Sequence, residues 1–289
     1  MQHNKNIQNN LSNGLYIIST PIGNLEDISQ RAILVLKEVD LIICENAKHS
    51  LKLLNNFGIK KKLVSLHDYN EIKVINKISN YYNNNKIALI SDAGSPLISD
   101  PGFKLIKYFI DNNYFITVIP GPSSLICSLQ LSGIPINKFS FYGFVPKQEI
   151  KRKQFFNDIK NNGLTSVFFV SANNLEKSLK SIFDLMGKRK IAICKEITKI
   201  NEAIFRGWVD DIYNQLKEKM INLKGEFTVV LGRDEKDSKG RMIVDHKIQI
   251  ELIKLLKKYS LTETVKIVHK LTCISKKNIY EMAIKLKND

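Results

Sequence analysis

The sequence lacks any long apolar segment of the kind that spans a membrane. Its 289 residues contain no apolar run approaching the roughly 20 residues that cross a bilayer, so we expect no membrane partner. The start, MQHNKNIQNNLSNG, is polar and rich in asparagine and has no apolar core of a signal peptide. We therefore expect residues 1–13 to form a disordered tail.

Cysteine is also scarce, and no two cysteines form a C-x-x-C pair. The four residues are Cys44, Cys127, Cys194 and Cys273. Three of them lie in apolar runs, where a free cysteine behaves as a small hydrophobic residue. The spacing argues against disulfides and against a zinc site, so we expect a reduced, cytoplasmic protein without a bound metal.

Several common catalytic and nucleotide-binding motifs are absent. There is no G-x-x-x-x-G-K-[ST] loop, and no G-x-G-x-x-G follows the first expected strand, which disfavours kinases, GTPases and NAD-dependent dehydrogenases. Neither G-x-S-x-G nor H-E-x-x-H occurs, which disfavours esterases and zinc proteases.

Arginine is rare although the chain is strongly basic. The formal net charge is +16, yet only six of the 44 Lys and Arg residues are arginines. Basic side chains neutralise phosphates, so this charge permits a nucleic-acid partner. Lysine, asparagine and isoleucine are also the residues that an AT-rich genome over-uses, so the charge does not require such a partner.

Apolar runs alternate with helix-like segments through the first 120 residues. The expected strands cover residues 15–19, 40–44, 62–66, 87–91 and 115–119. The expected helices cover residues 28–37, 48–56, 71–83 and 102–112. Strands separated by helices of this length predict βαβ units and a mostly parallel, doubly wound sheet.

A second block repeats the alternation of strands and helices. Its expected strands cover residues 139–144, 166–170, 190–194 and 226–232, and its helices cover 149–160, 174–185 and 209–220. Segment 233–241, RDEKDSKGR, has no apolar residue and is expected to be a linker. We predict a tail (1–13), an N-terminal α/β domain (14–120), a C-terminal α/β domain (121–241) and a helical module (242–289).

The expected helical module is basic. Residues 242–289 contain ten lysines and five acidic residues, a net charge of +5, and three helix-like segments. Ser260 and Glu263 have the spacing of a capping box, and Ser275 can cap the last helix. The pattern predicts a helix-turn-helix-like unit that either grips RNA or serves as a dimerisation or docking piece.

Three polar turns follow strands of the expected first sheet: STPIGNLED (19–27), SDAGSP (91–96) and IPGPSS (119–124). Ligands of parallel sheets bind beyond the carboxyl ends of the strands, so one ligand can touch all three turns. Small residues in the second turn let the main chain approach a ligand closely. In the third turn, Pro120, Gly121 and Pro122 form a stiff wall, and Ser123 and Ser124 can cap the next helix.

An ordered set of segments resembles the tetrapyrrole-methylase superfamily. These are LYIISTPIGNLEDISQRA, ISDAGSPLISDPGF, IPGPSS with SGIP, FYGFVP, CKEITKINEAIFRGW and GEFTVVL. Within the superfamily, the set is similar to the ribosomal RNA small-subunit methyltransferase I family, which 2′-O-methylates a cytidine (cytidine 1402) of 16S ribosomal RNA.

This resemblance implies a fold, a cofactor and partners. The fold would be two α/β domains of the class III (tetrapyrrole methylase) type with a cofactor cleft between them. The cofactor would be S-adenosylmethionine, leaving as S-adenosylhomocysteine, with no metal; the partners would be 16S ribosomal RNA in the small subunit and a second copy of the chain. The implied cofactor-binding residues are Pro21, Ile22, Gly23, Asp92, Ala93, Gly94, Ser95, Pro120, Gly121, Pro122, Ser123 and Ser124.

The implied reaction is an in-line displacement that a base or a lysine would assist. Charged candidates near the expected cleft are Asp27, Glu45, Lys48, His49 and Asp100. We choose Glu45, Lys48 and His49 as catalytic candidates, although each is equally explained as a solvated residue at the start of a helix. Asp100 is expected to cap the helix that starts near Pro101.

The chain departs from the family pattern in two segments. CENAKHS (44–50) stands where the family usually has an acidic pair followed by Thr and Arg, and only Glu45 is kept. VSANN (170–174) stands where Glu-Ser-Pro-His-Arg is common, and only Ser171 is kept. Lysine lacks the planar fork with which arginine grips phosphate or carboxylate, so the departures affect the RNA-side contacts and the catalytic assignment.

Two alternatives to an RNA methyltransferase stay open. One is a methyltransferase for a tetrapyrrole or another small molecule, which would need an open apolar trough and no basic module. The other is a non-catalytic ribosome-assembly factor, supported by the altered ENAK and VSANN segments.

Overall fold

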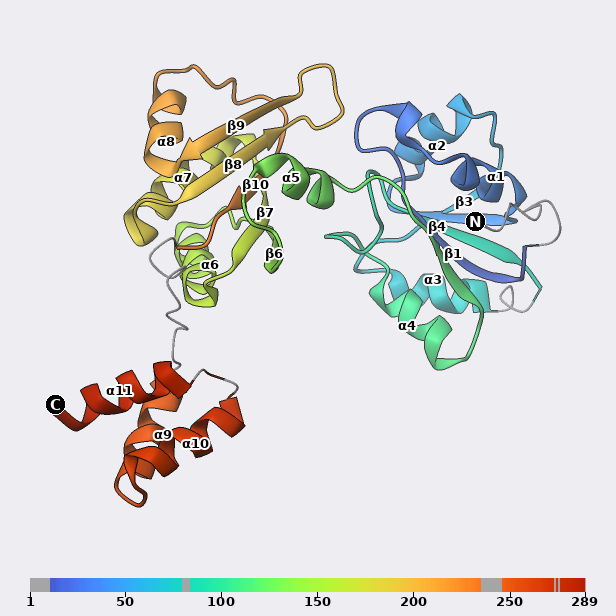
Figure 1. Cartoon of the computed structure of the whole chain (residues 1–289). Helices are drawn as coiled ribbons and strands as arrows, with labels where there is room; N and C mark the ends of the chain where they lie inside the picture. Colours follow the sequence, from blue (N-terminus) through green and yellow to red (C-terminus); the bar gives the residue numbers. More distant parts are fainter. Residues whose placement is uncertain (1–10, 80–83, 235–245, 273, 275, 289) are drawn as a thin grey trace, which may run out of the picture.

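The computed structural model describes residues 11–79, 84–234, 246–272, 274 and 276–288. Two five-stranded sheets follow one another along the chain, and three further helices come after them (Figure 1). No helix in these ranges has the length and apolar character that a membrane span requires.

The first sheet is entirely parallel, as the alternation of strands and helices predicts. Its strand order is β3-β2-β4-β1-β5. The strands are β1 (Gly14–Ile18), β2 (Leu41–Cys44), β3 (Lys62–Ser65), β4 (Lys86–Ile90) and β5 (Ile116–Ile119). The connecting helices are α1 (Gln30–Glu38), α2 (Ala47–Asn56), α3 (Glu71–Ile78) and α4 (Phe103–Asp111).

Helices cover both faces of this sheet because successive strand residues point to opposite sides. Leu15 and Ile17 of β1 belong to a core with α3 and α4, whereas Tyr16 and Ile18 belong to a core with α1 and α2. Figure 1 shows the two helix pairs on opposite sides of the strands. The sheet is therefore doubly wound.

The second sheet is mixed, with the order β6-β7-β10-β8-β9. Only β6 and β7 run parallel, and the three other pairs are antiparallel. The strands are β6 (Phe139–Phe144), β7 (Thr165–Ser171), β8 (Lys190–Lys195), β9 (Ala203–Trp208) and β10 (Glu226–Leu231).

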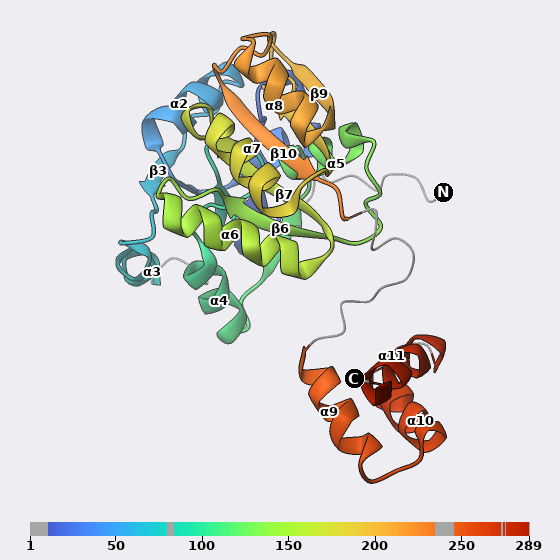
Figure 2. The ribbon, with the colours of Figure 1, turned by 90° about the vertical axis from the view of Figure 1, so that its left-hand side faces the viewer.

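Four helices cover the second sheet. α6 (Glu149–Asn162), α7 (Ala172–Met186) and α8 (Val209–Lys217) pack on one face around a core that includes Phe156 and Phe168. Figure 2 looks onto these three helices. α5 (Ser124–Ser132) packs on the other face, where Leu125 and Leu129 contact the strands.

The strand β9 is not expected from sequence, and the helix α5 is expected only as an unbounded helix after Ser123 and Ser124. β9 is an edge strand whose residues are only partly buried, and it contains Arg206 and Gly207. α5 buries Ser128 and Ser132 beside its leucines, and both hydroxyls donate to carbonyls of the same helix. Neither element therefore shows a simple apolar periodicity.

The last three helices form a separate small core. They are α9 (His246–Leu256), α10 (Leu261–Thr272) and α11 (Lys276–Asn288), and Leu252, Val265 and Ile279 are buried among them. The predicted capping box is confirmed: the Ser260 amide donates to Glu263 Oε2 over 3.1 Å, and the Glu263 amide donates to Ser260 Oγ over 3.3 Å.

Some expectations fall on residues outside the described ranges. These are most of the tail (1–10), most of the linker (235–241), the first residues of the helical module (242–245), the last residues of the third expected helix (80–83), Cys273 and the Ser275 cap. The domain boundaries at residues 120 and 241 stay predictions.

Candidate functional site

A cavity of about 450 Å³ lies where the carboxyl ends of the first sheet face the second sheet. The first half of the chain lines it with Ile22, Asp92, Ala93, Gly94, Ser95, Ile98, Ser99, Asp100, Ser123 and Ser124. The second sheet and its loops line it with Phe144, Phe169, Val170, Ser171, Ala172, Cys194, Glu196, Ile197, Gly225, Glu226, Phe227 and Thr228.

Hydrogen bonds join the first and second polar turns. The amides and carbonyls of Thr20 and Gly94 bond to each other in both directions, over 2.8 and 3.0 Å. The Thr20 hydroxyl also donates to the Ser91 carbonyl over 3.2 Å. Gly94 has φ +81°, and a Cβ there would lie 3.2 Å from Ile22 Cγ2, so the crossing favours glycine.

The third turn joins the other two. Ser95 Oγ lies 2.9 Å from Ser19 Oγ and donates to the Pro122 carbonyl over 3.3 Å. A Cβ on Gly121 would lie 3.0 Å from Ser19 Cβ, so the chain passes closely here. The structure therefore brings together the three turns that the sequence analysis singled out.

The cofactor-binding residues expected from sequence fall into two groups. Seven of them line the cavity: Ile22, Asp92, Ala93, Gly94, Ser95, Ser123 and Ser124. The other five belong to the same turns but not to the lining: Pro21, Gly23, Pro120, Gly121 and Pro122. Ser123 occupies the N-cap position of α5, as expected, but its hydroxyl makes no capping hydrogen bond.

The far wall comes from β6, β7 and β10, and its residues are not among the site residues expected from the sequence. The rings of Phe144 and Phe169 lie with centroids 5.1 Å apart, and Phe144 is 62% exposed. Gly143 before it has φ +68°, where the register between β6 and β7 shifts. The apolar end of FYGFVP is a signal for this wall, but only the folded sheet brings it to the turns.

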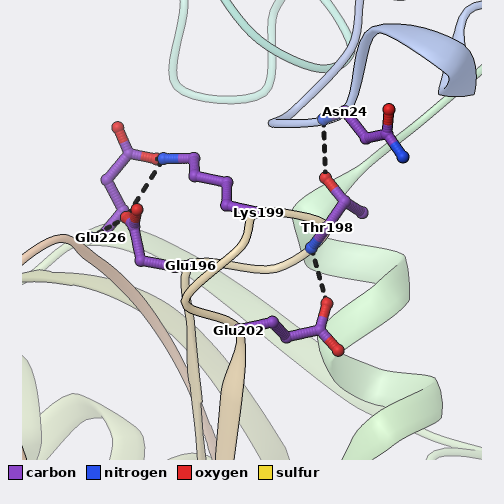
Figure 3. A network of polar contacts seen from close by, with 6 residues as sticks. All are labelled: Asn24, Glu196, Thr198, Lys199, Glu202 and Glu226. Carbon is purple, nitrogen blue, oxygen red and sulfur yellow. Dashed lines mark hydrogen bonds and ion pairs between the residues drawn. The ribbon is translucent and has the colours of Figure 1, made fainter.

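The loop between β8 and β9 closes one side of the cavity against the first turn (Figure 3). The Asn24 amide donates to Thr198 Oγ1 over 3.1 Å, and Ile22 packs with Ile197 and Cys194. A Cβ on Gly23 would lie 2.4 Å from Lys199 Cγ. The absence of a side chain at Gly23 therefore lets the two loops meet.

Ion pairs hold this loop in shape. Lys199 Nζ lies 3.1 Å from Glu196 Oε1 and 3.0 Å from Glu226 Oε2, and the Glu226 amide donates to Glu196 over 2.7 Å (Figure 3). Burial alone would raise the pKa of Glu196, but the bonds from the Glu226 amide and Lys199 outweigh it and lower that pKa. Glu196 is therefore a charged member of the cavity wall.

The cavity is acidic although the chain is basic. Four carboxylates line it, those of Asp92, Asp100, Glu196 and Glu226, and the described lining contains no lysine, arginine or histidine. Lys199 pairs with the two glutamates, whereas no ion pair to the two aspartates occurs in the described part of the chain. Such a wall favours a ligand that carries positive charge.

Two carboxyl groups at this end of the first sheet have raised pKa values. Burial and then the negative charge of Glu45 raise the pKa of Asp100 to about 7, against a hydrogen bond with Ser91, and Asp92 adds to the increase. Burial, Asp92 and Asp68 likewise raise the pKa of Glu45. The negative charges of these carboxylates therefore repel one another unless one carboxylate is protonated or a cation binds beside them.

The three catalytic candidates lie beside the cavity and not in its lining. Glu45 follows β2 and borders a small adjoining hollow together with Asp100. Lys48 and His49 lie on the exposed first turn of α2, where their amides donate to Asn46 Oδ1 over 3.1 and 3.3 Å. Asp27 is exposed at the end of a short 3-10 helix (Leu25–Asp27). Catalytic roles for these residues stay predictions.

The expectation that Asp100 caps a helix is wrong. α4 begins at Phe103 after Gly102, and the amides of Gly102 and Lys104 donate to the buried carboxylate of Glu71 over 3.1 and 2.8 Å. Glu71 is 31 positions from Gly102, so the local sequence around Pro101 could not reveal it. Asp100 is left to face the cavity.

The two segments that depart from the family pattern lie at the site's edge. Asn46 caps α2 with its side chain, and its amide donates to Asp92 Oδ1 over 3.2 Å. Ser171 and Ala172 line the cavity at the end of β7.

Burial raises the pKa of the lining residue Cys194 to about 12, so its thiol is protonated at neutral pH. The described residues include no group of three or more His, Cys, Asp or Glu side chains that could hold a metal ion.

Solved structures with this fold are similar in shape but distant in sequence. Diphthine synthase matches with a TM-score of 0.58 at 14% identity, over 75% of this chain and 89% of that one. Cobalt precorrin-4 methyltransferase matches with a TM-score of 0.54 at 15% identity, over 76% and 94%. At this identity, the likeness establishes the fold alone.

Sequence comparison is more specific. The family described as "Tetrapyrrole (Corrin/Porphyrin) Methylases" matches residues 14–213. A protein named Ribosomal RNA small subunit methyltransferase I from Rickettsia prowazekii is 38% identical over 96% of this chain and 98% of its own length. A Thermotoga maritima protein of the same name is 39% identical over 76% of this chain and 99% of its own length. The chain therefore belongs to the tetrapyrrole methylase family and, within it, to the group of the ribosomal RNA small subunit methyltransferase I proteins.

Proposed function

We propose that the chain transfers a methyl group from S-adenosylmethionine to the ribose 2′-oxygen of a cytidine in 16S ribosomal RNA, cytidine 1402 by family resemblance. The RNA part rests on a relative that aligns with the chain almost from end to end and is named for small-subunit ribosomal RNA. The cofactor part rests on one structural observation, the acid-lined cavity of a chain with a net charge of +16.

The cavity fits S-adenosylmethionine in size and in chemistry. About 450 Å³ is within the usual range for small-molecule sites. The ligand carries a sulfonium and an ammonium group, which suit the carboxylates of Asp92 and Asp100. Its adenine suits the apolar wall that includes Phe144 and Phe169, and its ribose and carboxylate suit serine hydroxyls and the amides of the turns.

We assign the holding of the cofactor to the three joined turns. Asp92, Ala93, Gly94 and Ser95 would meet it from one side, with Ile22, Ser123 and Ser124 beside them, while Pro21, Gly23, Pro120, Gly121 and Pro122 shape the turns. When bound, S-adenosylmethionine supplies an electrophilic methyl group. The chain's own contribution is to exclude water, to align the two reacting groups and to handle the hydroxyl proton.

The basic charge outside the cavity suits the RNA phosphates. Since four acidic residues line the cavity, the surplus of lysines lies on the rest of the chain, where it can attract a ribosomal subunit. A ribosomal RNA substrate implies a cytoplasmic reaction, and a homodimer is part of the proposal through the family resemblance.

The test uses purified protein, methyl-labelled S-adenosylmethionine and small ribosomal subunits from cells without this activity. We expect label on the 2′-oxygen of a single cytidine, located by nuclease mapping and mass spectrometry. Label on the base of a nucleotide, or on a tetrapyrrole offered in parallel, would show that the methyl acceptor is not the ribose. Intact cofactor binding without transfer to any of them would favour an assembly factor.

A further inference from the structure

Asp100 lines the cavity, and its carboxyl group hydrogen-bonds with Ser91 but does not cap the helix that follows. Its segment follows β4, and the carboxyl group borders both the main cavity and the hollow beneath it. The helix that follows receives its cap from Glu71, as described above. Since this half-buried carboxyl group neither caps a helix nor joins a described ion pair, its place in the cavity wall makes it available to a ligand.

The backbone before Asp100 is strained. Leu97 and Ser99 have φ values of +74° and +72°, which are unusual for residues with a side chain, above all for a bulky leucine. The Ser99 amide donates to the Leu97 carbonyl over 3.1 Å within this tight turn. Strain of this kind persists only where the surrounding structure enforces it, and it concentrates at functional sites.

The groups that face Asp100 come from two strand ends. Glu45 follows β2 and Asp92 follows β4, and both are acidic, while Ser91 offers a hydroxyl. Asp68 acts on Glu45 from the segment after β3. The pKa of about 7 makes Asp100 a stronger base than an ordinary aspartate while leaving much of it ionised at neutral pH.

Resting on the proposed function, we infer that the Asp100 carboxylate accepts the proton of the ribose 2′-hydroxyl during methyl transfer. The 2′-oxygen forms the new O–CH₃ bond, the C–S bond breaks with its electron pair staying on sulfur, and the hydroxyl proton passes to Asp100. The positive charge of the sulfonium and the negative charge of the carboxylate disappear in the same step. Burial contributes most to the raised pKa of Asp100, and Glu45 and Asp92 act through Asp100 because their negative charges add to that increase.

This assignment couples proton and methyl transfer through charge. A sulfonium in the cavity lowers the pKa of Asp100, so the carboxylate is ionised while the methyl donor is present. After transfer the sulfur is neutral, that attraction is lost, and the pKa returns toward its raised value. The proton is therefore held most firmly once the reaction has occurred.

The first test measures binding without catalysis. The affinities of the wild-type protein for S-adenosylmethionine and for S-adenosylhomocysteine are measured by calorimetry between about pH 6 and about pH 8. The preference for the sulfonium form should rise with pH, by about tenfold for each pKa unit by which the sulfonium lowers the pKa of Asp100. Asp100→Asn should abolish this rise, and Asp111→Asn, a matched change at an exposed aspartate paired with Lys107, should keep it.

The second test follows the rate. In the wild-type protein, kcat/KM should rise with pH to a plateau with a midpoint near the pKa of Asp100. Asp100→Asn should lower kcat by about 100-fold or more and remove this rise. Glu45→Gln removes a like charge, so it should move the rise to lower pH and retain most of the plateau rate. Loss of the rise in Glu45→Gln, with Asp100→Asn unaffected, would make Glu45 the acceptor and overturn the inference.

The outcomes separate this inference from the proposed function. If the wild-type protein labels the ribose and Asp100→Asn is as active as Asp111→Asn, the role of Asp100 is wrong and the function stands. If the wild-type protein labels no ribose, both are overturned. Should Asp100→Asn lose cofactor binding or melt early, Asp100→Glu decides: a shifted pH profile supports the inference, and an unchanged one overturns it.

Discussion

Gly94 is a residue on which the geometry of the turns depends. It pairs with Thr20, lines the cavity and has φ +81°. We expect Gly94→Ala to lower stability by about 1 to 2 kcal/mol, the cost of a left-handed alanine, and also to weaken S-adenosylmethionine binding about tenfold or more because the methyl group presses on Ile22. Calorimetric titration and thermal melting measure the two effects.

Gly133 provides the matched control for Gly94. It follows α5 with φ +68°, and a Cβ there would meet nothing within 4 Å. Gly133→Ala should cost a similar stability but leave cofactor affinity unchanged. Equal affinities for the two variants would contradict a cofactor site at Gly94.

Glu71 is a second residue whose role the structure defines. It is 4% exposed, and its two carboxylate oxygens accept from the amides of Gly102 and Lys104. Glu71→Ala leaves both amides without their charged partner, so we expect a loss of about 2 to 3 kcal/mol in the free energy of unfolding, measured in urea. Glu71→Gln should lose less, and Glu176→Ala on the exposed face of α7 should change little. A loss equal to that of Glu176→Ala would show that the cap contributes nothing.

Single residues also show which parts of the site could be predicted from the sequence and which could not. The turns around Asp92 and Gly94 could be predicted because strand ends of a parallel sheet meet at one edge, so a local motif suffices. The role of Asp100 could not be predicted, because Glu71, which caps α4 in its place, is distant in the sequence and meets Gly102 and Lys104 only in the fold.

At the scale of elements, the meeting of the first turn with the β8–β9 loop forms one wall of the cavity. Gly23→Ala would place a methyl group 2.4 Å from Lys199 Cγ and 3.0 Å from the Ile197 carbonyl oxygen. The loops must then separate, so we expect faster amide exchange in residues 196–202 and several-fold weaker cofactor binding, with the β1 core unchanged.

Gly207→Ala is the control for this element. Gly207 lies in β9, and a Cβ there would make an ordinary contact of 3.4 Å with Ile212. That variant should leave exchange in the β8–β9 loop as it is in the wild type. If Gly23→Ala also leaves exchange there unaltered, the loop contact does not restrain the cavity.

Elements differ in how well the sequence foretells them, for physical reasons. The inner strands of the first sheet, β1, β2 and β4, are buried on both faces, so they appear as continuous apolar runs between helices. β9 lies at a sheet edge and is half-exposed, and α5 buries serines whose hydroxyls are satisfied within the helix. The wall made by β7 and β10 depends on antiparallel pairing, which no local pattern specifies.

At the scale of the whole molecule, charge is divided between an acidic cavity and a basic remainder. Affinity for small subunits should therefore fall steeply as salt rises, because phosphate contacts release counterions. Binding of S-adenosylmethionine should change much less, because a partly enclosed cavity is screened less than a surface. Filter binding and calorimetry over the same salt series measure the two; parallel curves would contradict the division of charge.

The C-terminal helices allow this division to be tested by removal. α9, α10 and α11 have their own core. Ending the chain after Asp234 should therefore preserve the melting temperature of the two sheets and cofactor affinity. Because the removed part carries a net charge of +5 in residues 242–289, subunit affinity should fall and its salt dependence should become shallower.

The exposed pair Lys257 and Lys258, changed to glutamine, should reproduce part of the loss of subunit affinity. The same change at the exposed pair Lys177 and Lys180 of α7 serves as the equal-charge control. Subunit affinity that survives truncation, with a change in oligomeric state by light scattering, would instead make the helices a dimerisation unit.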